Sequence, residues 1–271
     1  MTTNQSLALP ATYPDAFRAE LRRAFSAPYE VPLVVVINGM LMSAAWFLLP
    51  VPLQDMLFTL HGSLAFPIVL VTWMFSDVPA TNVLGPDPQR ILAALDDPEA
   101  LRRLLYAKSA VLWLMAAPVC GAIAIGIGCV SHHWASMVIT TIGILVIPIG
   151  SLGVASWLGI CYPYHPIALA DRWAHRRAFR SMIVRWGVLV TLPYAVVPAI
   201  TTAMAAPAFL AWVLVSDDWQ QRIPTGELAI GVTFTVVLSA AVFVSGHRAG
   251  LRLIVCRRDR LAVFLADPEL G

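Results

Sequence analysis

The stretch SDVPATNVLGPDPQRILAALDDPEALRRLLYAK, residues 76–108, lies between two long apolar runs and decides the fold. It contains Asp87-Pro88 and Asp97-Pro98, two copies of a helix-start pattern. An Asp side chain can accept from the free backbone N–H groups at a helix start, and a proline in the first turn lacks an N–H that would have no partner there. Leucine and isoleucine recur behind each start. The stretch therefore predicts two short amphipathic helices, the second of which continues into a membrane span.

The composition is that of a membrane protein. Of the 271 residues, 59% are hydrophobic and only 13% are charged, whereas a soluble domain carries roughly 25% charged residues. We therefore expect an all-α membrane protein whose single transmembrane domain covers residues 1–271. The net charge of +2 is too small to indicate a nucleic-acid partner. The four cysteines form no C-x-x-C pair, so neither a disulfide framework nor a zinc site is expected.

Six apolar runs are long enough to be spans, since a span needs roughly 20 apolar residues. The expected spans are residues 31–50, 57–75, 109–130, 137–160, 187–215 and 228–245. The fifth run contains three prolines, so it predicts either a tilted helix or a helix followed by a segment that turns back. Ahead of the first span, residues 14–27 have the pattern of an amphipathic helix. That helix can lie in the lipid headgroup layer, or it can be solvated and packed on its own protein.

The positions of the basic residues predict the orientation. Seventeen of the eighteen Arg and Lys residues lie before the first span, between the second and third, between the fourth and fifth, or after the sixth. Only Arg222 falls on the other side. The positive-inside rule then places both termini and the two long polar loops in the cytoplasm, with the chain in the inner (plasma) membrane.

No catalytic, cofactor-binding or metal-binding residues are predicted. The sequence has no G-x-x-x-x-G-K-[ST] loop for nucleotide phosphates and no G-x-S-x-G or H-E-x-x-H motif. His132 and His133 are adjacent, which is not the spacing that places two ligands on one helix face. Gly150 and Gly153, and a series of Ala and Gly residues in the third span, are typical of close helix–helix packing. We expect the chain itself not to be an enzyme.

The second polar loop, residues 161–186, follows a proline stop at Tyr162-Pro163. A basic helix is expected over residues 171–185. Its bases can set the orientation and contact anionic lipid, or they can contact a partner protein, and the residues leave both interpretations open.

The whole layout resembles that of the ABC-2 type exporter permeases. Asn82-Val83-Leu84-Gly85-Pro86-Asp87 is similar to the N-x-[FL]-G-x-D that precedes the coupling helix in many actinobacterial members of the family. Residues 101–108 are similar to the R-x-L-L-x-G-K entry to their third span, with Ala107 where glycine is commoner. The proline stop after the fourth span is also similar. The resemblance implies six spans, an N-terminal connecting helix, and coupling helices between spans two and three.

The resemblance also implies a function and partners. The chain would be the transmembrane subunit of an ATP-driven exporter, forming the substrate path with a second permease subunit and energised by separate ABC ATPase subunits. Residues 87–106 would be the segment that contacts the ATPase. In this prediction, Ile91, Leu92 and Leu95 fill a groove on the partner, and charged residues form the rim. The predicted contact residues are Asp87, Arg90, Ile91, Leu92, Leu95, Asp97 and Arg102.

Two other functions are compatible with the sequence. An integral-membrane lipid-modifying enzyme would need clustered acids at the membrane surface. Asp77 with Asp87, or Asp96 and Asp97 with Glu99, are the candidates for that role, although no D-x-x-D metal pattern occurs. A non-catalytic assembly or scaffold subunit is the third possibility.

Overall fold

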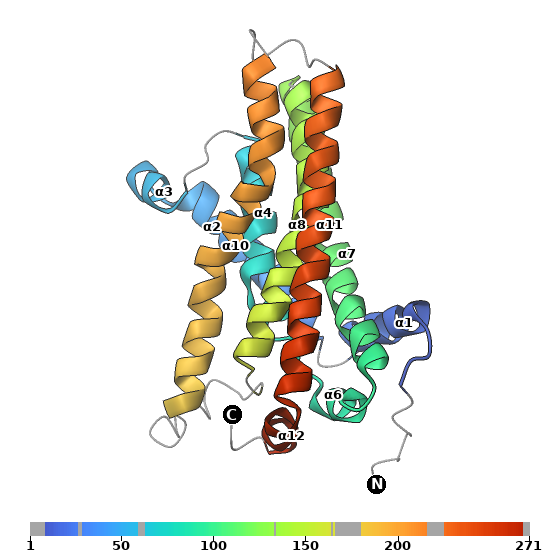
Figure 1. Ribbon diagram of the computed structural model, residues 1–271. Coiled ribbons are helices and arrows are strands. Elements are labelled where there is room, and N and C mark those ends of the chain that lie inside the picture. The colour runs from blue at the N-terminus through green and yellow to red at the C-terminus, as the bar shows by residue number, and fades with distance from the viewer. Residues whose placement is uncertain are drawn as a thin grey trace.

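The computed structural model describes residues 9–26, 29–58, 63–132, 134–163, 165, 180–215 and 225–267. All regular secondary structure in this part of the chain is helical. The helices are α1 Tyr13–Ala24, α2 Glu30–Leu48, α3 Val51–Leu57, α4 Ala65–Ser76, α5 Val78–Thr81, α6 Pro88–Ala94, α7 Pro98–Ser131, α8 Trp134–Cys161, α10 Arg180–Val215, α11 Thr225–Cys256 and α12 Arg258–Ala266. The long helices α7, α8, α10 and α11 stand side by side, with α4 among them (Figure 1). Helices α1, α6 and α12 gather at one end of this bundle, which we call its base.

Among the described residues, four helices are long and apolar enough to cross a membrane: Val31–Leu48, Pro98–Ser131, Ser136–Cys161 and Ala229–Cys256. They coincide with the first, third, fourth and sixth expected spans. The fifth expected span, 187–215, lies within α10, one unbroken helix of 36 residues that contains Pro193, Pro198 and Pro207. The described chain therefore continues as a helix through all three prolines, and the segment does not turn back.

The second expected span, 57–75, is not one helix. Leu57 ends α3, residues 59–62 lie outside the described part, and α4 begins only at Ala65. Pro67 stands in the first turn of α4, where proline is tolerated because the N–H groups there have no helical partner. With 12 residues, α4 is about 18 Å long. That length is less than the roughly 30 Å of a bilayer core.

The two expected helix starts in the polar stretch are found, but their Asp side chains behave differently. Asp97 accepts hydrogen bonds from the N–H groups of Glu99 and Ala100, both at 3.0 Å, so it caps α7 as predicted. Helix α6 begins at Pro88 as predicted, yet the Asp87 side chain makes no capping bond. Asp87 instead forms an ion pair with Arg90, which explains why α6 starts without a side-chain cap.

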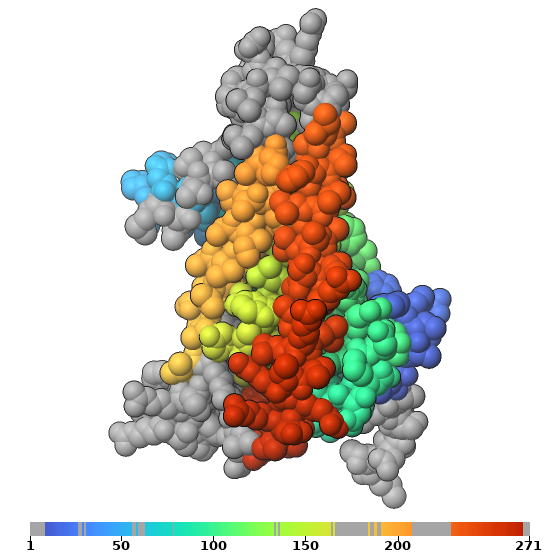
Figure 2. Space-filling view, viewed as in Figure 1, coloured from blue at the N-terminus to red at the C-terminus, as the bar shows by residue number. Residues whose placement is uncertain are grey.

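Apolar side chains form two separate cores. One lies inside the bundle and includes Met42, Phe75, Leu112, Ile144 and Leu152. The other, which we call the basal core, joins α6, α12, the first turns of α7 and the lower ends of α8 and α11. Its buried members are Val83, Leu84, Ile91, Ala94, Leu95, Ala100, Leu101, Leu104, Leu105, Ile160, Ile254, Leu261, Phe264 and Leu265. Figure 2 shows α12 and the start of α7 next to each other at the base.

Small residues set the spacing of the bundle, as predicted. A Cβ atom on Gly153 of α8 would lie 2.6 Å from the Cα of Phe243 in α11. A Cβ atom on Gly246 of α11 would lie 2.5 Å from the backbone of Gly153. These helices touch through their backbones, which only glycine permits. In α7, Ala117 and Ala124 are fully buried, so the small-residue stripe of the third span is also a packing surface.

Candidate functional site

Helix α12 covers the apolar side of α6. Ile91 is fully buried and Leu95 is 8% exposed, and both lie in the basal core with Leu261 and Phe264 of α12. The sequence accounts for this packing, because apolar residues three and four apart lie on one helical face. Leu261, Phe264 and Leu265 supply that face in α12.

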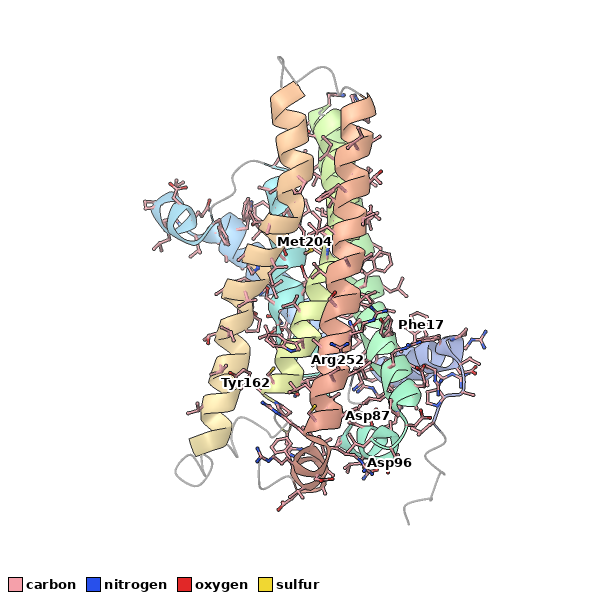
Figure 3. All side chains as sticks on the ribbon, viewed as in Figure 1. Phe17, Asp87, Asp96, Tyr162, Met204 and Arg252 are labelled. Atoms are coloured by element: carbon pink, nitrogen blue, oxygen red, sulfur yellow. The ribbon has the colours of Figure 1, made fainter. Side chains whose placement is uncertain are left out.

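Polar contacts hold α12 at both ends. Near its start, Arg258 pairs with Asp96, which follows α6 (Figure 3). Near its end, His165 Nε2 donates to the Phe264 carbonyl over 2.7 Å, and the two rings stack with centroids 4.7 Å apart. The last carbonyls of a helix have no partner within the helix, so this bond from His165 completes the end of α12. The pair of Arg258 and Asp96 thus joins α12 to the end of α6, and His165 holds the other end of α12.

Glu20 is the centre of a charged cluster between α1 and α6. Its side chain is 3% exposed and accepts from Arg23 Nε at 3.0 Å to each carboxylate oxygen. Arg90 Nη1 of α6 donates to Glu20 Oε2 over 3.3 Å, and Arg90 Nε lies 3.3 Å from Asp87 Oδ2. Burial alone would raise the pKa of Glu20. The hydrogen bond from Arg23 and the charges of Lys108, Arg23 and Arg90 outweigh it and lower that pKa below its ordinary value.

The two motifs that carry the family resemblance lie against each other. Asn82 Oδ1 accepts from the N–H of Gly85 at 3.2 Å, which closes a turn within 82–85. Lys108 Nζ donates to the Val83 carbonyl of the same turn over 2.6 Å. Val83 and Lys108 are 25 residues apart in the sequence, and the fold joins the two motifs into one corner between α5, α6 and α7.

A second polar cluster ties α2, α4 and α10 together. Asp77 directly follows α4 and is 9% exposed. It accepts from Asn38 Nδ2 of α2, and from the Tyr194 hydroxyl of α10 over 3.4 Å. The rings of Trp73 and Tyr194 lie beside it with centroids 4.6 Å apart. Buried polar groups are expected to be hydrogen-bonded, so this cluster fixes the positions of three helices relative to one another.

A third polar cluster lies between α7, α8 and α11. His247 Nδ1 donates to the Phe243 carbonyl at 3.0 Å, which leaves Nε2 as the acceptor for the Ser109 hydroxyl at 3.2 Å. Ser156 Oγ lies 3.5 Å from Ser109 Oγ. His247 and Ser156 are 1% exposed and Ser109 is 4% exposed. The pairing resembles a nucleophile and its base, but its burial fits a hydrogen bond that fastens helices.

The predicted partner contacts separate into buried and exposed groups. Ile91 and Leu95 complete the chain's own core, so a groove on a partner cannot receive them in this conformation. Leu92 is half-buried against the same core. The exposed side of α6 is instead formed by Gln89 and Ala93. The apolar pattern was correctly assigned to one face, and that face is covered by α12.

The charged members of the prediction are engaged within the chain. Arg90 and Asp87 belong to the Glu20 cluster, and Asp97 caps α7. Arg102 Nε donates to the Tyr13 hydroxyl over 2.6 Å and so links α7 to the start of α1. These side chains therefore stabilise the base of the bundle, whatever else they contact.

The acids that an enzyme would need are engaged in contacts within the chain. Asp77 lies with Asn38 and Tyr194, Asp87 with Arg90, and Asp96 with Arg258. Within the described ranges, no three His, Cys, Asp or Glu side chains come together to hold a metal ion. The basic helix expected over residues 171–185 lies mostly outside the described residues, and so does His133.

Several important residues were missed from the sequence. The amphipathic pattern of residues 14–27 does not predict that Glu20 is buried, and the helices predicted from the sequence include none over 258–266. The missed pattern in α1 is a stripe of Ala16, Glu20 and Ala24 at intervals of four, all buried. Phe17 and Phe25 form the neighbouring, more exposed side. The pattern in α12 is the i, i+3, i+4 spacing of Leu261, Phe264 and Leu265.

Comparisons of the chain with protein-family models, with curated proteins and with solved structures give no match. The function proposed next therefore depends on the chain's own residues.

Proposed function

We propose that this chain is the membrane subunit of an ATP-driven exporter, in which it forms the substrate path with a second permease subunit. Separate ATPase subunits would bind at the base, which would face the cytoplasm. In this proposal α4 and α10 join the four span-length helices in the membrane. The orientation is supported by the seventeen Arg and Lys residues that lie in segments predicted to be on one side of the membrane.

One observation carries the proposal. The basal core joins α6, α12 and the starts of α7 into one packed unit, and α7 and α11 run from this unit into the bundle without a break. Packed cores respond to force as rigid bodies, so a displacement of the base would move both long helices. A subunit that converts ATPase motion into helix motion requires such a connection.

The partner would contact the exposed side of this unit. Gln89 and Ala93 of α6 are exposed, and Asp96 and Glu99 add acidic side chains that are 73% and 59% exposed. On α12, Val263 is 61% exposed. We therefore assign the ATPase contact to the outer surface of α6 and α12, while Ile91 and Leu95 act from behind it by keeping the unit rigid.

Ala93→Arg tests this surface, because Ala93 points away from the core. An added arginine side chain would obstruct a partner without disturbing the fold, and we expect binding of the ATPase subunit to weaken at least about tenfold. Ala11→Arg places the same side chain on another exposed alanine and should bind as the wild type does. The measurement is co-purification of the ATPase subunit that binds the wild-type chain, together with cargo efflux. Equal assembly and equal efflux in both variants would show that α6 is not part of the interface with the ATPase.

The proposed orientation has its own test. In a chain without native cysteines, a cysteine at Ser131 should react with an impermeant maleimide added outside sealed cells, because Ser131 ends α7 at the far end of the bundle. A cysteine at Gln89 should react only after the membrane is opened. Labelling of Gln89→Cys in intact cells contradicts the orientation and the site of the ATPase.

A further inference from the structure

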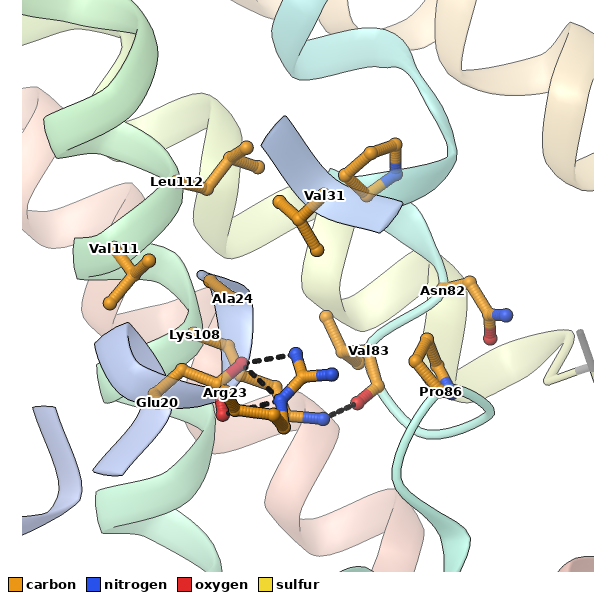
Figure 4. Close-up of a pocket in the computed structure, with 11 residues that line it drawn as sticks. Glu20, Arg23, Ala24, Val31, Asn82, Val83, Pro86, Lys108, Val111 and Leu112 are labelled. Carbon is orange, nitrogen blue, oxygen red and sulfur yellow. Dashed lines mark hydrogen bonds and ion pairs between the residues drawn. The ribbon is translucent and has the colours of Figure 1, made fainter. Parts of the chain in front are cut away.

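A small cavity of about 40 Å³ lies where α1, the turn after α5 and α7 meet (Figure 4). A water molecule needs roughly 10–15 Å³ of such space, so the cavity has room for a few waters or for the oxygens of a small anionic group. Its polar wall includes Glu20, Arg23, Asn82 and Lys108. Its apolar wall includes Val31 and Leu112.

Basic groups outnumber acidic groups around this cavity. Arg23, Arg90 and Lys108 face Glu20 and Asp87, which leaves one positive charge in excess. Glu20 is paired with both arginines and Asp87 with Arg90. Across the described residues, Lys108 has no carboxylate within the 4 Å of an ion pair. The excess charge is therefore located on its ammonium group.

Lys108 lacks a charged partner although it is half-buried. Its one hydrogen bond within the described chain goes to the neutral Val83 carbonyl, and an ammonium group has three donors. Taking a charge out of water is costly unless another group compensates it. The remaining donors, at the wall of a cavity, thus require waters or an anion.

The surroundings favour an anion that belongs to a lipid. Next to the lining residues Ala24 and Val31, the side chains of Phe25, Tyr29 and Leu33 are each more than half exposed. They form an apolar edge where α1 meets α2. A phospholipid has this arrangement of chemistry, since a phosphate group is joined to acyl chains, and lysine is a common point-charge ligand of phosphate.

We propose that Lys108 binds the phosphate group of an anionic phospholipid, which enters beside the α1–α2 corner and completes the charged cluster around Glu20. Free phosphate presents the same chemistry to Lys108, so the test separates the two sources. The proposal concerns the chain alone and needs no ATPase partner. If Lys108 binds no lipid, the proposed function is unaffected. If the chain binds no ATPase subunit, the lipid proposal is unaffected.

The test is calorimetric titration of the purified full chain in detergent with dihexanoyl phosphatidylglycerol and, separately, with inorganic phosphate. We expect saturable binding of the lipid. Lys108→Met should weaken it roughly tenfold to a hundredfold, since it removes a charge-assisted hydrogen bond. Arg248→Gln, which neutralises an exposed base on α11, should bind as the wild type does. Lys108→Gln, which keeps a donor for the Val83 carbonyl, replaces the methionine variant if that variant fails to fold.

Each outcome decides the matter. Lipid binding that depends on Lys108, with no binding of inorganic phosphate, supports a lipid headgroup site. Binding of both, each lost in the Lys108 variants, supports a phosphate site that free phosphate can also fill. Equal affinity in the wild type and the Lys108 variants overturns the proposal, as does the absence of saturable binding to the wild type.

Discussion

Gly153→Val is expected to destabilise the folded protein more than any other variant proposed for this chain. A Cβ atom at this position would lie 2.6 Å from the Cα and 2.7 Å from the carbonyl oxygen of Phe243. Both are backbone atoms of α11, so no rotation of a side chain relieves the overlap, and α8 and α11 must separate. Overpacking of a core costs roughly 1–3 kcal/mol and more where the backbone has to move. We expect a loss at the upper end of this range, measured by unfolding in mixed micelles of increasing sodium dodecyl sulfate.

Gly126→Val is the matched control. Gly126 lies in the last two turns of α7, and a Cβ atom there would meet nothing within 4 Å. The variant should unfold within about 0.5 kcal/mol of the wild type, as surface substitutions usually do. If both variants unfold alike, the backbone contact between α8 and α11 is not what holds the bundle together.

Glu20→Gln is expected to have the second largest effect. Glu20 is almost fully buried and neutralises Arg23 and Arg90, whose side chains are only 25% and 21% exposed. Removing one partner of a buried ionic group leaves the others uncompensated, which costs about 3 kcal/mol. The exposed pair of Asp15 and Arg18 provides the control, because Asp15→Asn should cost less than about 1 kcal/mol. The measurement is the free energy of unfolding of each variant at neutral pH.

The same residue makes stability depend on pH. The folded-state pKa of Glu20 is lowered, so its stabilisation is fully present above the pKa of an unfolded glutamate, about 4.3. It is lost progressively as the pH falls from there through the lower folded-state pKa. The wild type should therefore lose more stability than Glu20→Gln over this acidic range. Parallel pH profiles for the two proteins would show that Glu20 does not bind its arginines as a carboxylate.

The sequence allowed the helices to be predicted better than their packing. Asp97-Pro98 and Asp87-Pro88 both begin helices, because capping and proline placement are local properties of the backbone. The prediction of one helix over 57–75 was wrong, because an apolar run does not indicate where its helix begins. Helix α4 starts only at Ala65. Hydropathy measures how well a segment tolerates lipid, and it contains no information on continuity.

The candidate site was harder to predict, for a reason visible at Ile91. An apolar helix face indicates that something covers it, but the covering element can be a partner or another part of the same chain. Here it is α12, which is more than 160 residues further along the sequence. Glu20 illustrates the same difficulty, since its contact with Arg90 spans 70 residues. Pairings at such separations depend on the tertiary fold, which local patterns do not specify.

The cover over α6 also has a consequence for biosynthesis. Ile91 is synthesised long before Phe264, and at roughly 5–20 residues per second the ribosome needs on the order of ten to thirty seconds to reach α12. During that interval the apolar face of α6 lacks the cover that α12 provides and is more open to chaperones and proteases. A chain that stalls within α11 would keep this face without α12 and be marked for degradation. Completion of α12 would thus be the step at which the nascent subunit becomes stable.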